Sequence, residues 1–231
     1  LVGSEMCIRD RLTHDHGRTY ATMLEIFEHA GYTIDRKVLN AWNYGAPQKR
    51  ERLITIGIRN DLVGKTTYEF PKPHDYKPVL RDVLLDCPEG PGVQYGEKKK
   101  KIFELVPAGG YWRDIDPEIA KEYMKSCWNM EGGRTGILRR MSLDEPCLTV
   151  LTSPSQKQTE RCHPLEARPF TVRENARCQM FPDEWEFCGT VASQYKQVGN
   201  AVPVGLAFDV AKEIHKSLDN LDKAEVNLEE E

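Results

Sequence analysis

The chain has 231 residues, of which 39% are hydrophobic and 29% are charged, and its formal net charge is −4. This composition predicts a globular protein of one or two domains and excludes a disordered one. No apolar run approaches the roughly 18 residues of a membrane span, and no secretory signal opens the chain. The tail from Leu218 to Glu231 has six acids and one lysine, so the rest of the chain is mildly basic.

Cysteine usage indicates reduced thiols. The seven cysteines form no C-x-x-C pair, and no histidine pair has zinc-ligand spacing. We therefore expect neither a disulfide framework nor a bound metal, and we expect a cytoplasmic protein.

The first half of the sequence reads as an α/β fragment. Residues 1–16 fit no periodicity, and part of them resembles a translated DNA-library adapter, so we interpret them as non-native or disordered rather than as an ordinary polar N-terminus. Apolar residues at helical spacing predict a helix over 23–30 that Gly31 ends. Alternation over 32–38 and β-branched residues over 53–58 predict two strands, joined by a loop at 43–47.

The second half is less regular. Residues 59–105 contain five prolines and predict irregular structure, and the run Lys98–Lys101 favours a solvated face over phosphate contact. Residues 105–165 read as a small, loop-rich insert whose best strand is 147–152. Thr171 and Glu174 have the form of a capping box, which predicts a helix to Met180. Pro203 opens a last helix with one apolar stripe to Leu218.

Three segments could carry chemistry. Gln48, Arg50 and Arg52 alternate, so in an extended chain they would face one way and suit phosphate or carbonyl oxygens; exposed edge charge explains them equally well. The charged helix 171–180 favours a structural ion-pair role. Gly199–Asn200 predicts a turn that leads into a helix N-terminus and could hold an anion, which is a weak signal alone.

In this order the three segments resemble motifs of the DNA cytosine-5 methyltransferase family. N-Y-G-A-P-Q-K-R-E-R at Asn43–Arg52 is similar to the family's eighth motif. R-P-F-T-V-R-E-N-A-R-C-Q-M-F-P-D at Arg168–Asp183 is similar to the ninth, and Q-Y-K-Q-V-G-N-A-V-P-V at Gln194–Val204 to the tenth. The resemblance covers about residues 17–218.

The resemblance implies a C-terminal half. The family's Pro-Cys-Gln nucleophile motif, its Glu-Asn-Val motif and its glycine-rich cofactor loop do not occur in the sequence, and Cys147 is followed by Leu148. We therefore assign no catalytic residue to this chain and expect the nucleophilic cysteine and the glutamate in an absent N-terminal catalytic half. The chain alone is expected to be inactive.

The resemblance also implies a fold and domains. We expect the C-terminal part of a Rossmann-like, S-adenosylmethionine-dependent methyltransferase sheet, with a small target recognition domain inserted. The expected bounds are 17–104 and 166–218 for the catalytic α/β domain, 105–165 for the recognition domain and 219–231 for an acidic tail.

Site residues follow from the resemblance, position by position. Arg52 would reach the flipped cytosine or its phosphate, while Gln48 and Arg50 would order that loop. Asn200 and Ala201 would line the S-adenosylmethionine pocket. The insert is modestly basic, and its candidates for DNA contact are Arg134, Thr135, Arg139, Thr149, Thr152, Ser153, Gln156, Lys157, Gln158 and Arg161.

The expected function is methyl transfer from S-adenosylmethionine to C5 of a cytosine flipped out of duplex DNA, in a bacterial or phage restriction-modification system. Double-stranded DNA is the expected partner, possession of all motifs would make a monomer, and no membrane is involved. One alternative is a non-catalytic DNA-recognition subunit that completes a split methyltransferase with a separate N-terminal half. Another is a structural α/β fragment without a ligand. All assignments require that the Gln48–Arg52 loop and Gly199–Asn200 meet at one cavity.

Overall fold

The structure is a computed structural model that describes residues 18–129, 134–154, 156 and 159–229. They form two compact units, each described by itself. Unit 1 takes the chain up to Gly45, Glu51–Tyr76 and the chain from Val204, and unit 2 takes Ala46–Arg50 and Lys77–Pro203. These bounds differ from those of the predicted domains, because residues 46–50 and 166–203 pack with the predicted insert. The predicted N-terminal segment 1–16 lies outside the described residues.

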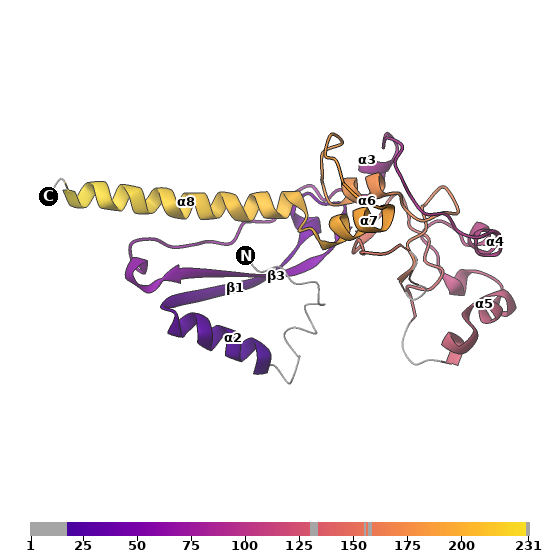
Figure 1. Cartoon of the computed structure of the whole chain (residues 1–231), viewed down its shortest axis with the longest axis horizontal. Coiled ribbons are helices and arrows are strands. Elements are labelled where there is room, and N and C mark those ends of the chain that lie inside the picture. The colour runs from indigo at the N-terminus through magenta and orange to yellow at the C-terminus, as the bar shows by residue number, and fades with distance from the viewer. Residues whose placement is uncertain (1–17, 130–133, 155, 157–158, 230–231) are drawn as a thin grey trace. The chain divides into compact units, whose positions relative to one another are not determined.

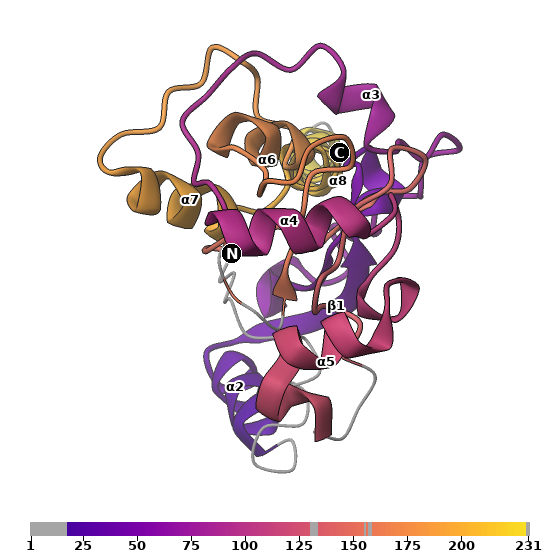
Figure 2. The same ribbon diagram turned by 90° about the vertical axis from the view of Figure 1, so that its right-hand side faces the viewer.

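Unit 1 is built on an antiparallel pair of strands. Its elements are α2 (Arg18–His29), β1 (Tyr32–Asn40), η2 (Ala41–Tyr44), β3 (Glu51–Arg59), η3 (Asn60–Leu62) and α8 (Val204–Glu229). β1 pairs with β3 so that Val38 lies opposite Leu53, and α2 and α8 lie on opposite sides of this pair (Figures 1 and 2). Gly31 has a φ of +86° and follows α2, as predicted. The pairing is antiparallel, whereas a Rossmann-like sheet is mostly parallel.

Helix α8 is longer than predicted. It continues to Glu229 instead of ending at Leu218, so the predicted acidic tail 219–231 is helical over its described residues. The residues beyond Leu218 include leucine, alanine, lysine and glutamate, which are good helix formers. Leu206 and Val210 of the predicted apolar stripe are buried.

Unit 2 contains short elements joined by long loops. They are β2 (Gln48–Lys49), α3 (Arg81–Leu84), α4 (Glu97–Leu105), η4 (Trp112–Asp114), α5 (Pro117–Met124), η5 (Lys125–Asn129), β4 (Cys147–Leu148), α6 (Val172–Cys178) and α7 (Val191–Asn200). β2 and β4 form a two-residue parallel pair. Helix α4 corrects the prediction of an irregular segment to residue 105, because good helix formers follow the last of the five prolines. Lys99 lies on it with its Nζ 2.6 Å from the buried Glu160 carboxylate, so the lysine run is only in part a solvated face.

Two hydrophobic cores stabilise unit 2. One includes Leu80, Val150, Phe170, Cys178 and Tyr195, and thus joins α3, the β4 region, α6 and α7. The other joins α4 and α5, which lie next to each other in Figure 2, with residues 137–138 and 162. The predicted recognition insert therefore has its own core, but that core begins before residue 105.

The strand predicted over 147–152 is reduced to Cys147–Leu148. The cause is the backbone of Val150, whose N–H donates to Gln48 Oε1 at 3.1 Å and whose carbonyl accepts from Arg50 Nη1 at 2.9 Å. Side chains therefore take the place of a neighbouring strand. No helix in the described part of the chain has the length and apolarity needed to cross a membrane.

Candidate functional site

Gln48 joins the loop after Gly45 to the segments that follow it far along the chain. Its side chain is fully buried. Its Nε2 donates to the carbonyl of Cys178 at 2.8 Å and to Gln179 Oε1 at 2.6 Å, and its Oε1 accepts from Val150 N. An amide with both donors used and an acceptor used has no capacity left for a substrate. Its contacts make Gln48 a residue that orders the loop.

Arg50 makes the second link. Its side chain is buried, and its two Nη atoms donate to the carbonyls of Val150 at 2.9 Å and Gly199 at 2.7 Å. Gly199 permits this approach, because a Cβ there would lie 2.6 Å from backbone atoms of Leu151 and Thr152. The guanidinium thus fixes the residues after β4 against the end of α7.

Gln179 completes the network and was missed by the sequence reasoning. It is fully buried, and its Nε2 donates to the carbonyls of Val198 at 2.7 Å and Ala201 at 3.1 Å. Since Gln48 bonds to its Oε1, hydrogen bonds connect all three motif-like segments. A glutamine inside an otherwise apolar stretch, Cys178 to Phe181, was the available signal, because buried amides need several partners.

The Gly199–Asn200 prediction requires correction. These residues form the last turn of α7 and not a turn that leads into a helix N-terminus. The N–H of Ala201 donates to the carbonyl of Val198 at 3.3 Å, and its own carbonyl is bonded to Gln179. The residues lie at the negative end of a helix dipole, so the suggested anion site is not formed.

Arg52 lies apart from Gln48 and Arg50. It belongs to unit 1, where it faces Leu39 across β1–β3, is half-buried and donates to the carbonyl of Glu51 at 2.7 Å. The three side chains do not share one face, because Arg50 interrupts the strand between β2 and β3. The cavity predicted for Arg52 together with Asn200 stays a prediction, since these residues lie in different units.

The ninth-motif helix has the structural role that its charge pattern favoured. Thr171 caps α6, with the Glu174 side chain bonded back to the Thr171 N–H at 2.7 Å. Arg168 holds both carboxylate oxygens of Glu174 at 2.8 Å. Burial raises the pKa of Glu174, but the bonds from Arg168 and Thr171 outweigh it, so that pKa lies below its usual 4.5. Arg177 pairs with Asp183 at 2.6 Å and also with Asp86.

The candidates for DNA contact fall into three groups. Arg134 and Thr149 bond within the protein: Arg134 donates to the carbonyls of Cys127 and Trp128, and Thr149 Oγ1 donates to the carbonyl of Lys49 at 2.8 Å. Arg139 and Arg161 lie side by side on neighbouring segments. The remaining described candidates are partly or fully exposed, namely Thr135, Thr152, Ser153 and Gln156, while Lys157 and Gln158 lie outside the described residues.

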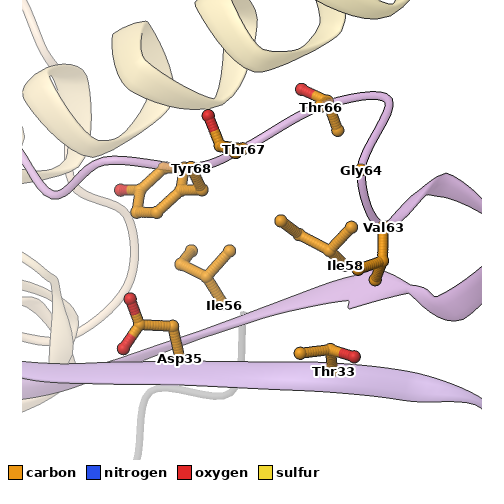
Figure 3. A pocket seen from close by; sticks show the side chains of 9 residues that line it. All are labelled: Thr33, Asp35, Ile56, Ile58, Val63, Gly64, Thr66, Thr67 and Tyr68. Carbon is orange, nitrogen blue, oxygen red and sulfur yellow. The ribbon is translucent and has the colours of Figure 1, made fainter.

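A cavity of about 250 Å³ lies in unit 1 and contains none of the predicted site residues. Figure 3 shows Asp35 and Thr33 on one side of it and Tyr68 and Thr67 on the other. Burial raises the pKa of Tyr68 to about 12, and its hydroxyl has no hydrogen-bond partner in the described part of the chain. A second cavity of about 350 Å³ adjoins it and reaches Ile214 and Ser217 of α8.

The described residues do not form a complete site for S-adenosylmethionine. The Ala201 carbonyl is bonded to Gln179, and neither of the two cavities above is lined by the exposed Asn200. Within the described ranges, no group of three or more His, Cys, Asp or Glu side chains could hold a metal ion.

Comparisons with known proteins agree with the motif resemblance. The family model for C-5 cytosine-specific DNA methylase matches residues 9–216. The chain is 53% identical over 209 residues to the type II methyltransferase M.Sau96I of Staphylococcus aureus, covering 90% of this chain and 49% of that protein. It is 49% identical over 224 residues to M.Eco47II of Escherichia coli, covering 94% and 54%. The chain therefore spans about half the length of these relatives.

Solved structures show the fold. One match is a protein of E. coli whose title describes a DNA modification methyltransferase encoded within a prophage, with a TM-score of 0.61, 22% identity, and 90% of this chain and 67% of that chain covered. Another is the Dnmt2 methyltransferase of S. pombe, with a TM-score of 0.51, 14% identity, and 85% and 60% covered. The fold is an α/β methyltransferase fold.

The comparisons correct one prediction. The sequence interpretation took the chain as the C-terminal half of a family member that lacks the N-terminal catalytic half. The matches instead support homology to the N-terminal half of the type II methyltransferases, of which 49% and 54% are covered. The assignment to a C-terminal half is therefore withdrawn, while the resemblance over most of the chain is confirmed.

Proposed function

Because the chain belongs to the C-5 cytosine-specific DNA methylase family, we propose that it is part of a type II restriction-modification enzyme that methylates C5 of a cytosine in a duplex DNA site. The network of Gln48, Arg50 and Gln179 carries this proposal. It joins the three motif-like segments in unit 2, although 100 or more residues separate Arg50 from the carbonyls that it binds.

The residues of this chain have different roles in the proposed reaction. Gln48 and Arg50 are positioning residues, since buried carbonyl and amide groups use their polar atoms. Arg52 is the candidate for contact with the flipped cytosine or its phosphate, because a guanidinium can bind either with two parallel hydrogen bonds. The α4–α5 core supports the residues that we propose to contact DNA.

Family members use S-adenosylmethionine, which supplies the methyl group when bound. Asn200 and Ala201 remain the candidates for contact with it. Since Ala201 already bonds to Gln179, we expect its contribution to be the shape of the backbone at this point.

We propose that this chain alone does not transfer methyl groups. Its sequence contains neither Pro-Cys-Gln nor Glu-Asn-Val, and addition of a thiolate to C6 of cytosine is what makes C5 nucleophilic in the family. The test is transfer of a radiolabelled methyl group from S-adenosylmethionine to mixed-sequence duplex DNA by the purified chain. Turnover above that of a heat-denatured sample would refute this part of the proposal.

A second candidate function is a DNA-recognition subunit that works with a separate polypeptide carrying the nucleophile. Its support is the coverage of only about half of each curated relative. β3 also pairs with β1 alone among the described strands, which leaves an edge that another chain could extend. The flanking genomic sequence separates the two candidates. One continuous reading frame with both motifs supports a single enzyme, and a neighbouring gene with its own start codon supports a split one.

DNA binding by the chain tests both candidates against the alternative of a structural fragment. We expect duplex DNA to bind and the affinity to fall as salt rises, because phosphate contacts release counterions. Absence of binding at low salt would contradict both candidate functions.

A further inference from the structure

Two arginines of the recognition region lie on paired backbone segments. Arg140 and Cys162 form a parallel bridge, in which the Cys162 N–H donates to the carbonyl of Arg139 at 3.0 Å and the Met141 N–H donates to the carbonyl of Cys162 at 3.0 Å. Residues one position earlier on each segment are therefore also neighbours, and their side chains point to the same face. These residues are Arg139 and Arg161.

The opposite face of this pair belongs to the protein interior. Cys162 is fully buried in the core between α4 and α5. The guanidinium of Arg140 donates to the carbonyls of Phe103, Val106 and Pro164 at 3.0–3.2 Å. Arg140 thus has an internal role, and the alternation of side chains directs Arg139 and Arg161 away from this core.

Arg139 and Arg161 lack the close carboxylate partners that other arginines of the chain have. Arg168, Arg177 and Arg81 each have a carboxylate oxygen within 2.8 Å. Arg139 reaches Glu145 only at 3.8 Å, and Arg161 Nη1 donates to the backbone carbonyl of Glu160 at 2.9 Å.

The donors of this arginine pair are not fully used. The Nε atoms of Arg139 and Arg161 are both buried without a hydrogen-bond partner in the described part of the chain. Burial lowers the pKa of Arg161, and the neighbouring charge of Arg139 lowers it further. Two guanidiniums held together in this way are more stable when an anion lies between them.

Glu160 holds the two segments in place. Its carboxylate is fully buried and accepts from Tyr123 Oη at 2.5 Å, from Leu138 N at 2.6 Å and from Lys99 Nζ at 2.6 Å. Leu138 and Glu160 are the residues directly before Arg139 and Arg161. The arginine pair is therefore mounted on a buried, fully bonded group and is preorganised for a ligand.

We propose that Arg139 and Arg161 together grip one phosphodiester of the DNA backbone. This inference rests on the proposed function and refines it, because the pair then positions the recognition region on DNA without reading a base. A phosphate offers several oxygens to two planar guanidiniums, and each can make bidentate bonds to it.

The test is duplex binding by the full chain, measured by fluorescence anisotropy over a series of KCl concentrations. One lost phosphate contact lowers the slope of log affinity against log salt by about 0.9. We expect the double variant Arg139→Gln/Arg161→Gln to lose about 0.9. The control Arg59→Gln removes the same charge from an arginine held by Asp61 at 2.6 Å, and it should leave the slope unchanged.

The outcomes separate this inference from the proposed function. An unchanged slope in the double variant, with wild-type chain bound to DNA, overturns the shared grip alone. A loss of about 1.8 shows two separate phosphates and also overturns it. Wild-type chain that binds no DNA contradicts the proposed function itself.

Two further measurements guard against misfolding and a different anion. The variant Arg139→Lys/Arg161→Lys keeps both charges but loses the planar forks, so it should keep the slope and bind more weakly. If inorganic phosphate at matched ionic strength raises the melting temperature of the wild type alone and the DNA slopes agree, the site belongs to free phosphate, and the inference is overturned.

Discussion

Replacement of Arg50 by methionine should destabilise unit 2 strongly, although the residue lies in a surface loop in the sequence pattern. The change keeps the length and apolar stem of the side chain and removes its donors. The carbonyls of Val150 and Gly199 would each lose a charged hydrogen bond of 2.9 and 2.7 Å in a buried setting. A hydrogen bond to a charged group contributes about 1.5–3 kcal/mol, so we expect a loss of about 3–6 kcal/mol in the free energy of unfolding.

The assay is urea unfolding followed by tryptophan fluorescence, because Trp112, Trp128 and Trp185 all lie in unit 2. The matched control is Arg81→Met, which breaks a half-exposed ion pair with Asp144 and should cost about 0–1 kcal/mol. If both variants unfold within about 1 kcal/mol of each other, the reasoning on the Arg50 network is refuted.

Three other predictions follow from the same contacts. In the complete methyltransferase, Arg52→Ala should lower kcat about 10- to 150-fold, the equivalent of a lost charged bond of about 1.5–3 kcal/mol, and leave the melting temperature unchanged; equal activity would show that Arg52 does not contact the base or its phosphate. Gly199→Ala should lower the melting temperature even though alanine favours helices, because its Cβ would meet backbone of Leu151 at 2.6 Å; a higher melting temperature would contradict this. The lowered pKa of Glu174 stabilises the folded chain above its usual 4.5, and this stabilisation is lost as the pH falls through the folded pKa. Arg168→Gln should therefore move acid unfolding, followed by circular dichroism, to higher pH, and an unmoved midpoint would argue against the pair.

The sequence determined those features whose causes lie within a few residues. The stop after α2 needs a residue that accepts a positive φ, and Gly31 is that residue. The capping box of α6 joins Thr171 to Glu174, three residues apart, and the alternation of β1 follows from the pleat of a strand. The motif-like segments also indicated the family, because their order and spacing are properties of the sequence itself.

Only the tertiary structure decided how the site is assembled. Whether Gln48 and Arg50 face a substrate or the interior depends on carbonyls and amides that lie 100 to 149 residues away, and local patterns carry no information about them. The same holds for Gly199, which is required by the close approach of another segment and not by a turn. The arginine pair on the 139 and 161 segments was seen in the sequence as two separate basic residues. Backbone pairing across the insert makes them neighbours, because hydrogen-bond partners between distant segments are chosen by packing.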